Sequence, residues 1–261
     1  MPDERAGGLV STALAQALVA ARRQHGLLPA TDWAQALHSP AEAYAVQDAV
    51  AAELAWFLFA PPTHWKSGGP SRDAVLTHAP LPPAGVRTSP ASFADWPMHS
   101  RAIEAEIALR LAVDVSPAQA AALRPEAVDP LIEAMTVSIE VCDSRWREGA
   151  QAPALLRLAD LQSHAALTLG DWIPYARRDW LMQRCEVRIG AQPLVVRHGS
   201  HALGDPAWLL PQWLQHATRD GATVAAGTVV TTGTWVGMLP AQPGDEVSVE
   251  FAGIGAAALQ L

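Results

Sequence analysis

The order of secondary-structure signals along this chain predicts an α+β fold. Residues 1–62 are rich in alanine and leucine and contain helix-start signals, whereas strand-like runs dominate from residue 63 onward. Pro61 and Pro62 separate the two regions. A segment of helices followed by a run of strands is typical of α+β proteins. We therefore predict an N-terminal helical segment over residues 1–62 and a strand-rich domain over residues 63–261.

Two helices are expected in the first region. Residues 11–24 carry leucines at helical spacing and are followed by a glycine that can end a helix. The second helix begins at Ser39, because Ser39 and Glu42 form the pattern of a capping box and Pro40 occupies the first helical position. We expect it to continue to about Phe59, just before the prolines.

Two strand-like runs carry carboxylates on their polar faces. Glu104 and Glu106 alternate with apolar side chains in residues 102–115, and Glu140 does so in residues 134–145. Alternate side chains of a strand share a face, so Glu104 and Glu106 point the same way. If the two strands are neighbours, three carboxylates converge, and such oxygens are ligands for hard cations such as Mg²⁺ or Mn²⁺. The alternative is an ordinary solvated face of an antiparallel sheet.

The rest of the chain alternates short helices with strands. A helix is expected to start near Leu158, with Asp160 on its polar side. The other expected elements, in order, are a helix over 117–123, a hairpin over 185–198, a helix over 206–219, and strands over 223–232, 234–239 and 246–251.

Composition excludes several classes of function. The chain has 261 residues, of which 50% are apolar and 17% charged, and its net charge is −8. It has neither the basic stripe of a nucleic-acid-binding protein nor an apolar run long enough to span a bilayer. The N-terminus lacks a signal-peptide pattern, and Cys142 and Cys185 give no disulfide or zinc framework. We therefore expect a cytoplasmic protein whose partner is a small molecule, not a nucleic acid or a membrane.

Six short motifs follow one another in a characteristic order. They are AYAVQ at 43–47, WKSG at 65–68, IEAEIA at 103–108, EVCDSR at 140–145, LGDP at 203–206 and TGTWVG at 232–237. In their order and spacing they resemble the motifs of the fumarylacetoacetate hydrolase superfamily. Within that superfamily, the chain resembles the group of 2-keto-4-pentenoate hydratases and 4-oxalocrotonate decarboxylases. In the last motif, Trp235 stands where the hydrolase branch has proline.

This resemblance implies a fold, a cofactor and an activity. The fold would be the mixed β-roll of the fumarylacetoacetate hydrolase C-terminal domain, with Mg²⁺ or Mn²⁺ held by Glu104, Glu106 and Glu140. The activity would be that of a lyase, a hydratase that adds water to a short 2-hydroxy-dienoate or 2-oxo-alkenoate through a metal-bound enolate, in the breakdown of aromatic compounds. The alternatives are a 4-oxalocrotonate-type decarboxylase, an acylpyruvate C–C hydrolase and a non-catalytic partner subunit. The family also implies a homo-oligomer, one that can form a complex with a related pathway enzyme.

Five further residues are candidates for the site, each with a simpler structural alternative. Lys66 is a solvated charge or, by resemblance, a catalytic group that transfers a proton or stabilises negative charge. Asp160 is a helix-start residue or a catalytic neighbour of the metal site. Arg145 forms a structural ion pair or binds the substrate carboxylate. Thr234 lies in a strand bend or binds a carboxylate, and Trp65 belongs to the core or to the wall of a substrate pocket.

Overall fold

The computed structural model describes residues 4–261, and the contacts within it group the chain into two compact units. We call them the helical unit and the sheet unit. The helical unit comprises Met1–Pro61, Pro97–Ser100 and Cys142–Ala165. The sheet unit comprises Pro62–Trp96, Arg101–Val141 and Ala166–Leu261. Each unit is therefore assembled from segments that are distant in the sequence.

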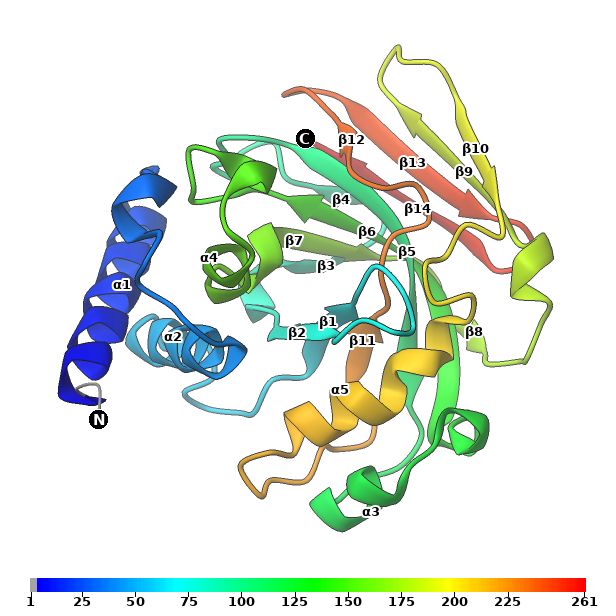
Figure 1. Ribbon diagram of the computed structural model, residues 1–261. Helices are drawn as coiled ribbons and strands as arrows, with labels where there is room; N and C mark the ends of the chain where they lie inside the picture. Colours follow the sequence, from blue (N-terminus) through cyan, green and yellow to red (C-terminus); the bar gives the residue numbers. More distant parts are fainter. Residues whose placement is uncertain (1–3) are drawn as a thin grey trace. The chain divides into compact units, whose positions relative to one another are not determined.

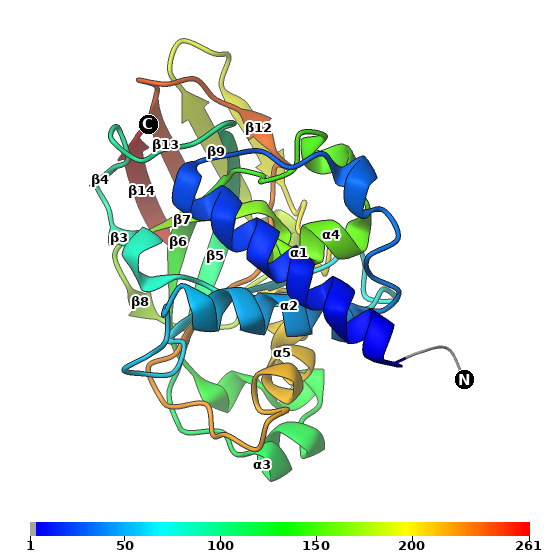
Figure 2. The same ribbon diagram turned by 90° about the vertical axis from the view of Figure 1, so that its left-hand side faces the viewer.

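The helical unit contains three α-helices, α1 (Glu4–Gln24), α2 (Pro40–Glu53) and α4 (Ala154–Ala159). Helix α1 packs on α2, and α2 packs on α4 (Figure 2). The helix predicted to begin at residue 11 therefore starts earlier, and the prediction that the second helix reaches Phe59 is wrong. Helix α2 ends at Glu53 because Ala55 adopts a positive φ of 54°, which an α-helix does not accommodate.

One of the two hydrogen bonds of the capping box predicted at the start of α2 is present. Ser39 Oγ accepts a hydrogen bond from the backbone N–H of Glu42 at 3.3 Å, as a capping residue should. Glu42 does not return the bond to Ser39. Its Oε2 accepts from the backbone N–H of His38 at 2.6 Å. The start of α2 is therefore correctly predicted by the Ser39–Pro40 pair.

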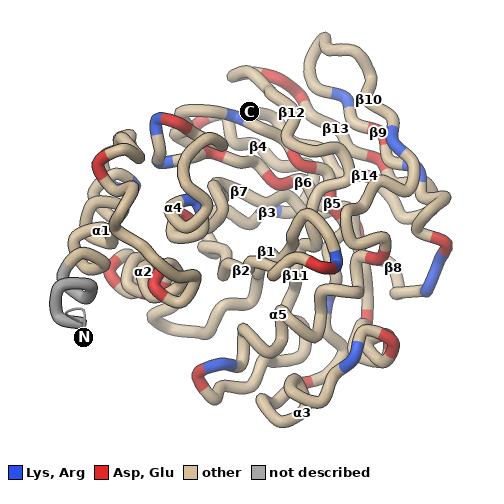
Figure 3. Tube along the Cα trace, viewed as in Figure 1, with Lys and Arg blue, Asp and Glu red and all other residues tan. Residues whose placement is uncertain are grey.

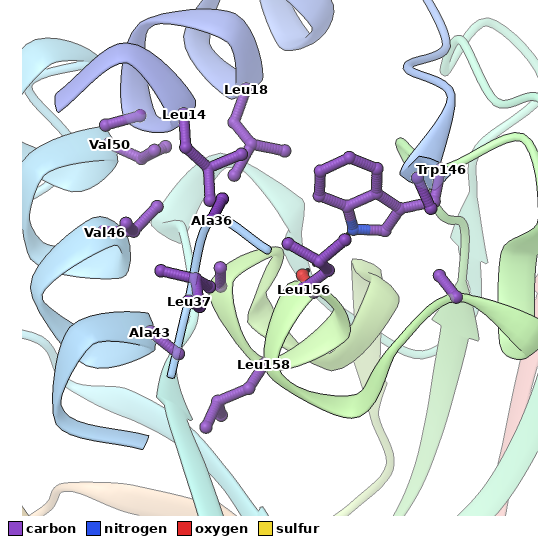
Figure 4. Packing of buried hydrophobic residues seen from close by; sticks show 14 of the residues in the cluster. Leu14, Leu18, Ala36, Leu37, Ala43, Val46, Val50, Trp146, Leu156 and Leu158 are labelled. Atoms are coloured by element: carbon purple, nitrogen blue, oxygen red, sulfur yellow. Dashed lines mark hydrogen bonds between the residues drawn. The ribbon is translucent and has the colours of Figure 1, made fainter. Parts of the chain in front are cut away.

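An apolar cluster holds the helical unit together. Figure 4 shows Leu14 and Leu18 from α1 facing Val46 and Val50 from α2, with side chains from α4 beside them. Trp146 lies in the same cluster, and its indole N–H donates to the carbonyl of a residue in α4 at 3.0 Å. Burial of each such side chain stabilises the fold by about 1.5–3 kcal/mol. This cluster explains why the alanine-rich first helix is stable.

The prediction that a helix starts near Leu158 is wrong. Helix α4 ends at Ala159, and Asp160 is its C-cap residue. The next residues, Leu161 to Ser163, form a 3-10 turn and have φ values of 53°, 53° and 63°. Positive φ values are incompatible with helix continuation. Asp160 therefore lies at the end of a helix rather than at its beginning.

The sheet unit is built on a nine-stranded sheet (Figure 1). Its main strand order is β2-β1-β11-β5-β6-β7-β3, while β12 pairs with β5 and β8 pairs with β6. The strands are β1 (His64–Gly68), β2 (Thr77–Pro80), β3 (Val86–Thr88), β5 (Ala102–Leu111), β6 (Ile132–Cys142), β7 (His164–Leu169), β8 (Ile173–Pro174), β11 (Val229–Thr231) and β12 (Leu239–Pro240). The two carboxylate strands predicted from the sequence are β5 and β6, and they are neighbours.

A second sheet has five strands in the order β10-β9-β13-β14-β4. They are β4 (Ala91–Ser92), β9 (Arg184–Ile189), β10 (Val195–His198), β13 (Glu246–Phe251) and β14 (Gly255–Gln260). The predicted hairpin over 185–198 is confirmed as β9 and β10, whereas β14 was not expected. Two short helices, α3 (Pro117–Ala122) and α5 (Leu210–Ala217), pack on each other in the same unit.

Strand directions confirm the predicted α+β class with a mixed sheet. Strand β1 is parallel to β11 and β3 is parallel to β7, while β5 is antiparallel to both β11 and β12. Lys and Arg are interspersed with Asp and Glu along both units (Figure 3). Among the helices of the described residues, none combines the length and hydrophobicity that a membrane span requires.

Candidate functional site

Strand pairing places Lys66, Glu104 and Glu106 on one face of the nine-stranded sheet. Lys66 in β1 is the register partner of Thr231 in β11, and Thr231 is the partner of Ala108 in β5. Partners in adjacent strands point to the same face, and so do residues two apart in one strand. Glu106 and Glu104 therefore share the face of Ala108, and with it the face of Lys66.

An apolar cluster adjoins the carboxylates on this face. It contains Ala108, the same-face neighbour of Glu106, together with Leu81, Leu167, Leu169 and Val229. Only 2% of Glu106 and none of Glu140 is exposed. The polar faces of the two strands thus turn into the protein rather than toward solvent. The alternative of a solvated antiparallel face does not apply to Glu106 and Glu140.

Between β11 and β12 the chain departs from the nine-stranded sheet, next to the part of β5 that carries Glu104 and Glu106. Thr231 in β11 pairs with Ala108, and Leu239 in β12 pairs with Ile103. From Thr231 to Leu239 the chain advances by eight residues, whereas the paired part of β5, from Ala108 to Ile103, spans only five. Residues 232–238 therefore form a loop outside the strand pairing. The backbone N–H of Trp235 still donates to the carbonyl of Ala105 at 2.8 Å. Within this loop, the backbone N–H of Gly233 reaches Glu106.

Glu106 is held by donors that the sequence analysis did not identify. Its Oε2 accepts a hydrogen bond from the hydroxyl of Thr231 and another from the backbone N–H of Gly233 at 3.1 Å. Ser138 Oγ lies 2.9 Å from Thr231 Oγ1 and extends this network into β6. No described residue donates to Oε1 of Glu106. Ser138 is two residues from Glu140 and so shares its strand face, but the contact of Ser138 with Thr231 depends on the order of the strands in the sheet.

Glu140 and Lys66 form a buried ion pair. Lys66 Nζ lies 2.5 Å from Glu140 Oε1, and the Lys66 side chain is 14% exposed. One carboxylate oxygen each of Glu104 and Glu140 lies within 4.8 Å of the other. β6 ends two residues later at the buried Cys142, which forms no disulfide. Residues 66, 104, 106 and 140, predicted as site residues, are thus brought together in the sheet unit.

The electrostatics of this cluster fit a divalent cation. Burial, together with the nearby Glu140 and Glu104, raises the pKa of Glu106 to about 8, whereas Lys66 and the Thr231 hydroxyl act in the opposite direction. The charged form of Glu106 is thus disfavoured by its surroundings. Buried charge of one sign is unfavourable until a proton or a counter-ion neutralises it. Carboxylate oxygens suit Mg²⁺ and similar hard cations.

Trp65 and Thr234 lie near this cluster in sequence but differ in placement. Trp65 precedes Lys66 in β1 and so points to the opposite face, where its ring lies 6.4 Å from that of Trp213 in α5. Thr234 belongs to the loop of residues 232–238. Its hydroxyl donates to the carbonyl of Gly237 at 3.0 Å and accepts from the backbone N–H of Val236 at 3.2 Å. The substrate-binding roles of Trp65 and Thr234 stay predictions.

Asp160 and Arg145 lie together in the helical unit. Asp160 Oδ1 is 2.6 Å from Arg145 Nε and 2.8 Å from Arg22 Nη2, and Oδ2 accepts from the backbone N–H of Arg145 at 3.0 Å. Arg145 Nη2 also donates to the carbonyls of Asp160 and His164. Arg145 is only 6% exposed. The ion pair anticipated for Arg145 is present, and the catalytic role of Asp160 stays a prediction.

A groove of about 850 Å³ opens on the five-stranded sheet. Arg188, Asp245, Glu246 and Ser248 are among the residues that line it, and Arg188 is 65% exposed at its side chain. The polar groups there are mostly in contact with water. Solvated charges need no ligand for neutralisation, so the buried carboxylates are the stronger candidate for the functional site.

A comparison with known protein families identifies the chain. Residues 66–261 match the sequence pattern described as the fumarylacetoacetate (FAA) hydrolase C-terminal domain. The chain belongs to the fumarylacetoacetate hydrolase family. The match begins at Lys66 and includes all three carboxylates of the site, so the family predicted from the motifs is confirmed. No curated protein sequence matches the chain.

Solved structures extend the family likeness to the whole fold. The 4-oxalocrotonate decarboxylase from Pseudomonas putida G7, in complexes with calcium and acetate and with magnesium and adipate, superposes with a TM-score of 0.80 at 19% identity over 96% of each chain. The 2-hydroxyhepta-2,4-diene-1,7-dioate isomerase from Mycobacterium marinum gives a TM-score of 0.55 at 16% identity, covering 77% of this chain and 74% of the isomerase. At these identities the likeness shows the fold alone.

The two solved structures match different lengths of this chain. The decarboxylase shares the fold over nearly the full length, whereas the isomerase shares about three quarters of it. The fumarylacetoacetate hydrolase family match itself covers 66–261 and leaves the first 65 residues outside. The N-terminal helices thus have a counterpart in the decarboxylase fold.

Proposed function

We propose that this member of the fumarylacetoacetate hydrolase family is a divalent-cation-dependent hydratase, a lyase that acts on a short 2-hydroxy-dienoate or 2-oxo-alkenoate. The observation that carries the proposal is the cluster formed by the buried Glu106 and Glu140 and the half-buried Glu104, in which the pKa of Glu106 is raised to about 8. A cluster of this kind favours a cation and places a titratable group near neutral pH.

The three carboxylates are the proposed ligands of Mg²⁺ or Mn²⁺. Both hydrogen bonds to Glu106 from described residues go to Oε2, which leaves Oε1 as the oxygen for the cation. When bound, the cation would supply Lewis acidity that withdraws negative charge from the C1 carboxylate and the C2 oxygen of the substrate. The magnesium and calcium complexes of the similarly folded decarboxylase support a divalent ion.

Lys66 is the proposed proton-transfer group. Its Nζ lies 2.5 Å from Glu140 Oε1, and the pair is largely buried, so the ammonium group is held in one position beside the carboxylates. A proton delivered from Nζ to C5 of the dienol, with loss of the proton from the C2 hydroxyl, would produce the conjugated 2-oxo-3-alkenoate, and the hydroxyl proton would restore the ammonium of Lys66. Water then adds across C3 and C4, with hydroxyl at C4 and a proton at C3. The adjoining apolar cluster limits access of bulk water to this face.

Decarboxylation is the second candidate. It requires the same charge withdrawal at C1 and C2, but the electrons come from loss of CO₂ at the far end of 2-oxo-3-hexenedioate instead of from a dienol. The likeness over 96% of both chains to a 4-oxalocrotonate decarboxylase favours this alternative. An acylpyruvate C–C hydrolase and a non-catalytic partner subunit are weaker alternatives, because no observation in the sheet unit specifically favours either.

One assay separates these candidates. Purified protein is mixed with freshly prepared 2-hydroxypenta-2,4-dienoate and, separately, with 2-oxo-3-hexenedioate, each with Mg²⁺, with Mn²⁺ or with EDTA. We expect cation-dependent loss of the diene absorbance and formation of 4-hydroxy-2-oxopentanoate. Release of CO₂ from the second substrate alone would replace the hydratase by a decarboxylase. Cation binding without turnover of either substrate would contradict both.

The remaining expectations concern assembly and location. By family resemblance we propose a homo-oligomer that works in the cytoplasm on a small 2-oxo or 2-hydroxy acid, with a related pathway enzyme as a possible protein partner. Analytical ultracentrifugation of the purified chain tests the assembly, and a monomer at micromolar concentration would contradict it.

A further inference from the structure

We propose that His201 is a positioning residue for Glu106, acting through the peptide bond between Thr232 and Gly233. The proposal goes beyond the metal-ligand assignment, and its effect on cation binding rests on the proposed function. His201 lies in the segment before LGDP and had no role assigned from the sequence. Only 5% of it is exposed.

The first step is the hydrogen bond of the imidazole. His201 Nε2 lies 2.8 Å from the carbonyl oxygen of Thr232. A carbonyl only accepts, so Nε2 carries the proton and donates. Burial lowers the pKa of His201 to about 4 despite the opposing effect of this hydrogen bond, so the ring is neutral near neutral pH. The tautomer with the proton on Nε2 is therefore fixed by the fold.

The second step is the peptide itself. The carbonyl of Thr232 and the N–H of Gly233 belong to one planar peptide, and they point in opposite directions. That N–H donates to Glu106 Oε2 at 3.1 Å. A donor on the carbonyl side fixes the plane and polarises the N–H on the other side. The three groups thus form a chain of hydrogen bonds from His201 to the carboxylate.

The third step is the freedom that this chain of bonds removes. Gly233 has a φ of 99°, a region in which glycine alone is at ease and in which the preceding peptide can rotate at little cost. Without His201, the buried carbonyl of Thr232 would lose its donor, at a cost of about 1–3 kcal/mol unless the peptide turned to find another. Such a rotation would carry the N–H away from Glu106.

The side chains of Ser200 and Thr232 also hold this loop, but they do not bond to the peptide between Thr232 and Gly233. Ser200 Oγ donates to the carbonyl of Trp235 at 2.5 Å, and Thr232 Oγ1 donates to the carbonyl of Ile107 at 2.7 Å. Both bonds fix residues on either side of the peptide, whereas neither reaches its C=O or N–H. His201 also packs on Trp235, with ring centroids 5.4 Å apart. The test must separate this packing from the hydrogen bond.

The variants are H201L, which keeps bulk and removes the donor, and H201Q, whose amide N–H can replace Nε2–H. In cation-free protein, NMR hydrogen exchange of the Gly233 amide is the primary readout. We expect exchange in H201L to be about tenfold faster than in wild type, the equivalent of one lost hydrogen bond, and exchange in H201Q to be near wild type. The Mg²⁺ affinity from calorimetry should fall by a similar factor in H201L and recover in H201Q.

The outcomes distinguish the inference from the function on which it rests. Unchanged protection of Gly233 in H201L, or equal loss in H201L and H201Q, would overturn the positioning role and leave packing on Trp235. A ¹⁵N spectrum of wild type with the proton on Nδ1 would overturn it as well. If wild type binds no Mg²⁺, the metal assignment fails, while the exchange result still decides the role of His201. H201N, whose amide is too short to reach Thr232, replaces H201L if that variant does not fold.

Discussion

Two buried charge clusters in this chain are built in opposite ways. In the helical unit, Asp160 accepts hydrogen bonds from Arg22 and Arg145, and both of its oxygens are used. In the sheet unit, Lys66 pairs with Glu140, and burial together with the nearby Glu140 and Glu104 raises the pKa of Glu106 to about 8. Asp160 is thus held between two guanidinium groups, whereas Glu106 lies beside two other carboxylates.

This difference supports a structural role for the first cluster and the proposed cation site for the second. Burial lowers the pKa of Arg22 to about 10, which leaves the guanidinium charged at neutral pH, and Asp160 neutralises it within the fold. Glu106, in contrast, has a raised pKa, so its charged form is disfavoured until a proton or a cation neutralises it. A buried carboxylate whose hydrogen bonds are made by arginines within the fold stabilises that fold, whereas a buried carboxylate with a raised pKa is a candidate for ligand binding.

The largest expected effect is on the helical unit. Asp160→Ala leaves Arg145 and Arg22 without their counter-ion, and breaking a buried pair in this way costs about 3–5 kcal/mol. Urea unfolding measures the loss. Arg23→Ala, which removes the exposed pair with Glu53, is the matched control and should change stability by less than about 1 kcal/mol. Lost turnover at unchanged stability would instead favour a catalytic role for Asp160.

Lys66→Ala should affect the rate rather than the fold. Removal of the ammonium leaves the carboxylates more negative, so we expect Mg²⁺ binding to be retained while turnover falls by about 100-fold or more, the usual contribution of a proton-transfer group. Calorimetry and the diene assay measure the two quantities separately. A normal rate would remove Lys66 from the mechanism, and loss of Mg²⁺ binding would make it a structural part of the site.

Glu106→Gln should weaken Mg²⁺ binding by about 100-fold, because it removes a charged ligand rather than a residue that only hydrogen-bonds to a ligand.

Glu106→Gln should also change the pH dependence of stability. The pKa of Glu106 is raised in the folded protein, so the folded state binds the extra proton and loses stability as pH rises from about 4.5 to about 8. Cation-free wild type should show this loss, and E106Q should show less of it. Thermal unfolding at pH 5 and pH 8 tests the sign, and identical slopes would contradict the raised pKa.

The smallest expected effect comes from Thr231→Val, which removes the hydroxyl that donates to Glu106 and keeps the shape of the side chain. One hydrogen bond to a charged group contributes about 1.5–3 kcal/mol at most, so Mg²⁺ affinity should fall by about tenfold or somewhat more. Thr232→Val is the control, because its equally buried hydroxyl donates to the Ile107 carbonyl and not to Glu106. Equal effects of the two variants would mean that the Thr231 contact has no special part in the site.

The fold and the carboxylate cluster follow from local patterns. Alternation along residues 102–111 and 132–142 correctly orients Glu104, Glu106 and Glu140, and Ser39 with Pro40 fixes the start of α2. Local patterns are sufficient here because strand period and helix capping depend on near neighbours.

Other features depend on residues far apart in the sequence and were missed. Thr231 and Gly233 meet Glu106 only because β11 pairs with β5, and His201 acts through a peptide 31 residues away. The misplaced helix at Leu158 has a related cause. Asp160 has the sequence pattern of a helix-start residue, but the arginines that bind it come from α1 and from the segment that follows β6.

The loop of residues 232–238 is anchored mainly by backbone contacts with the nine-stranded sheet. Backbone hydrogen bonds from Trp235 to Ala105 and strand pairing at Thr231 and Leu239 anchor it without help from the side chains at 236–238. Met238 is 48% exposed. Changes confined to the side chains at 236 and 238 would therefore alter the surface of the loop while the strand pairings on both sides of it and the Gly233 bond to Glu106 stay the same.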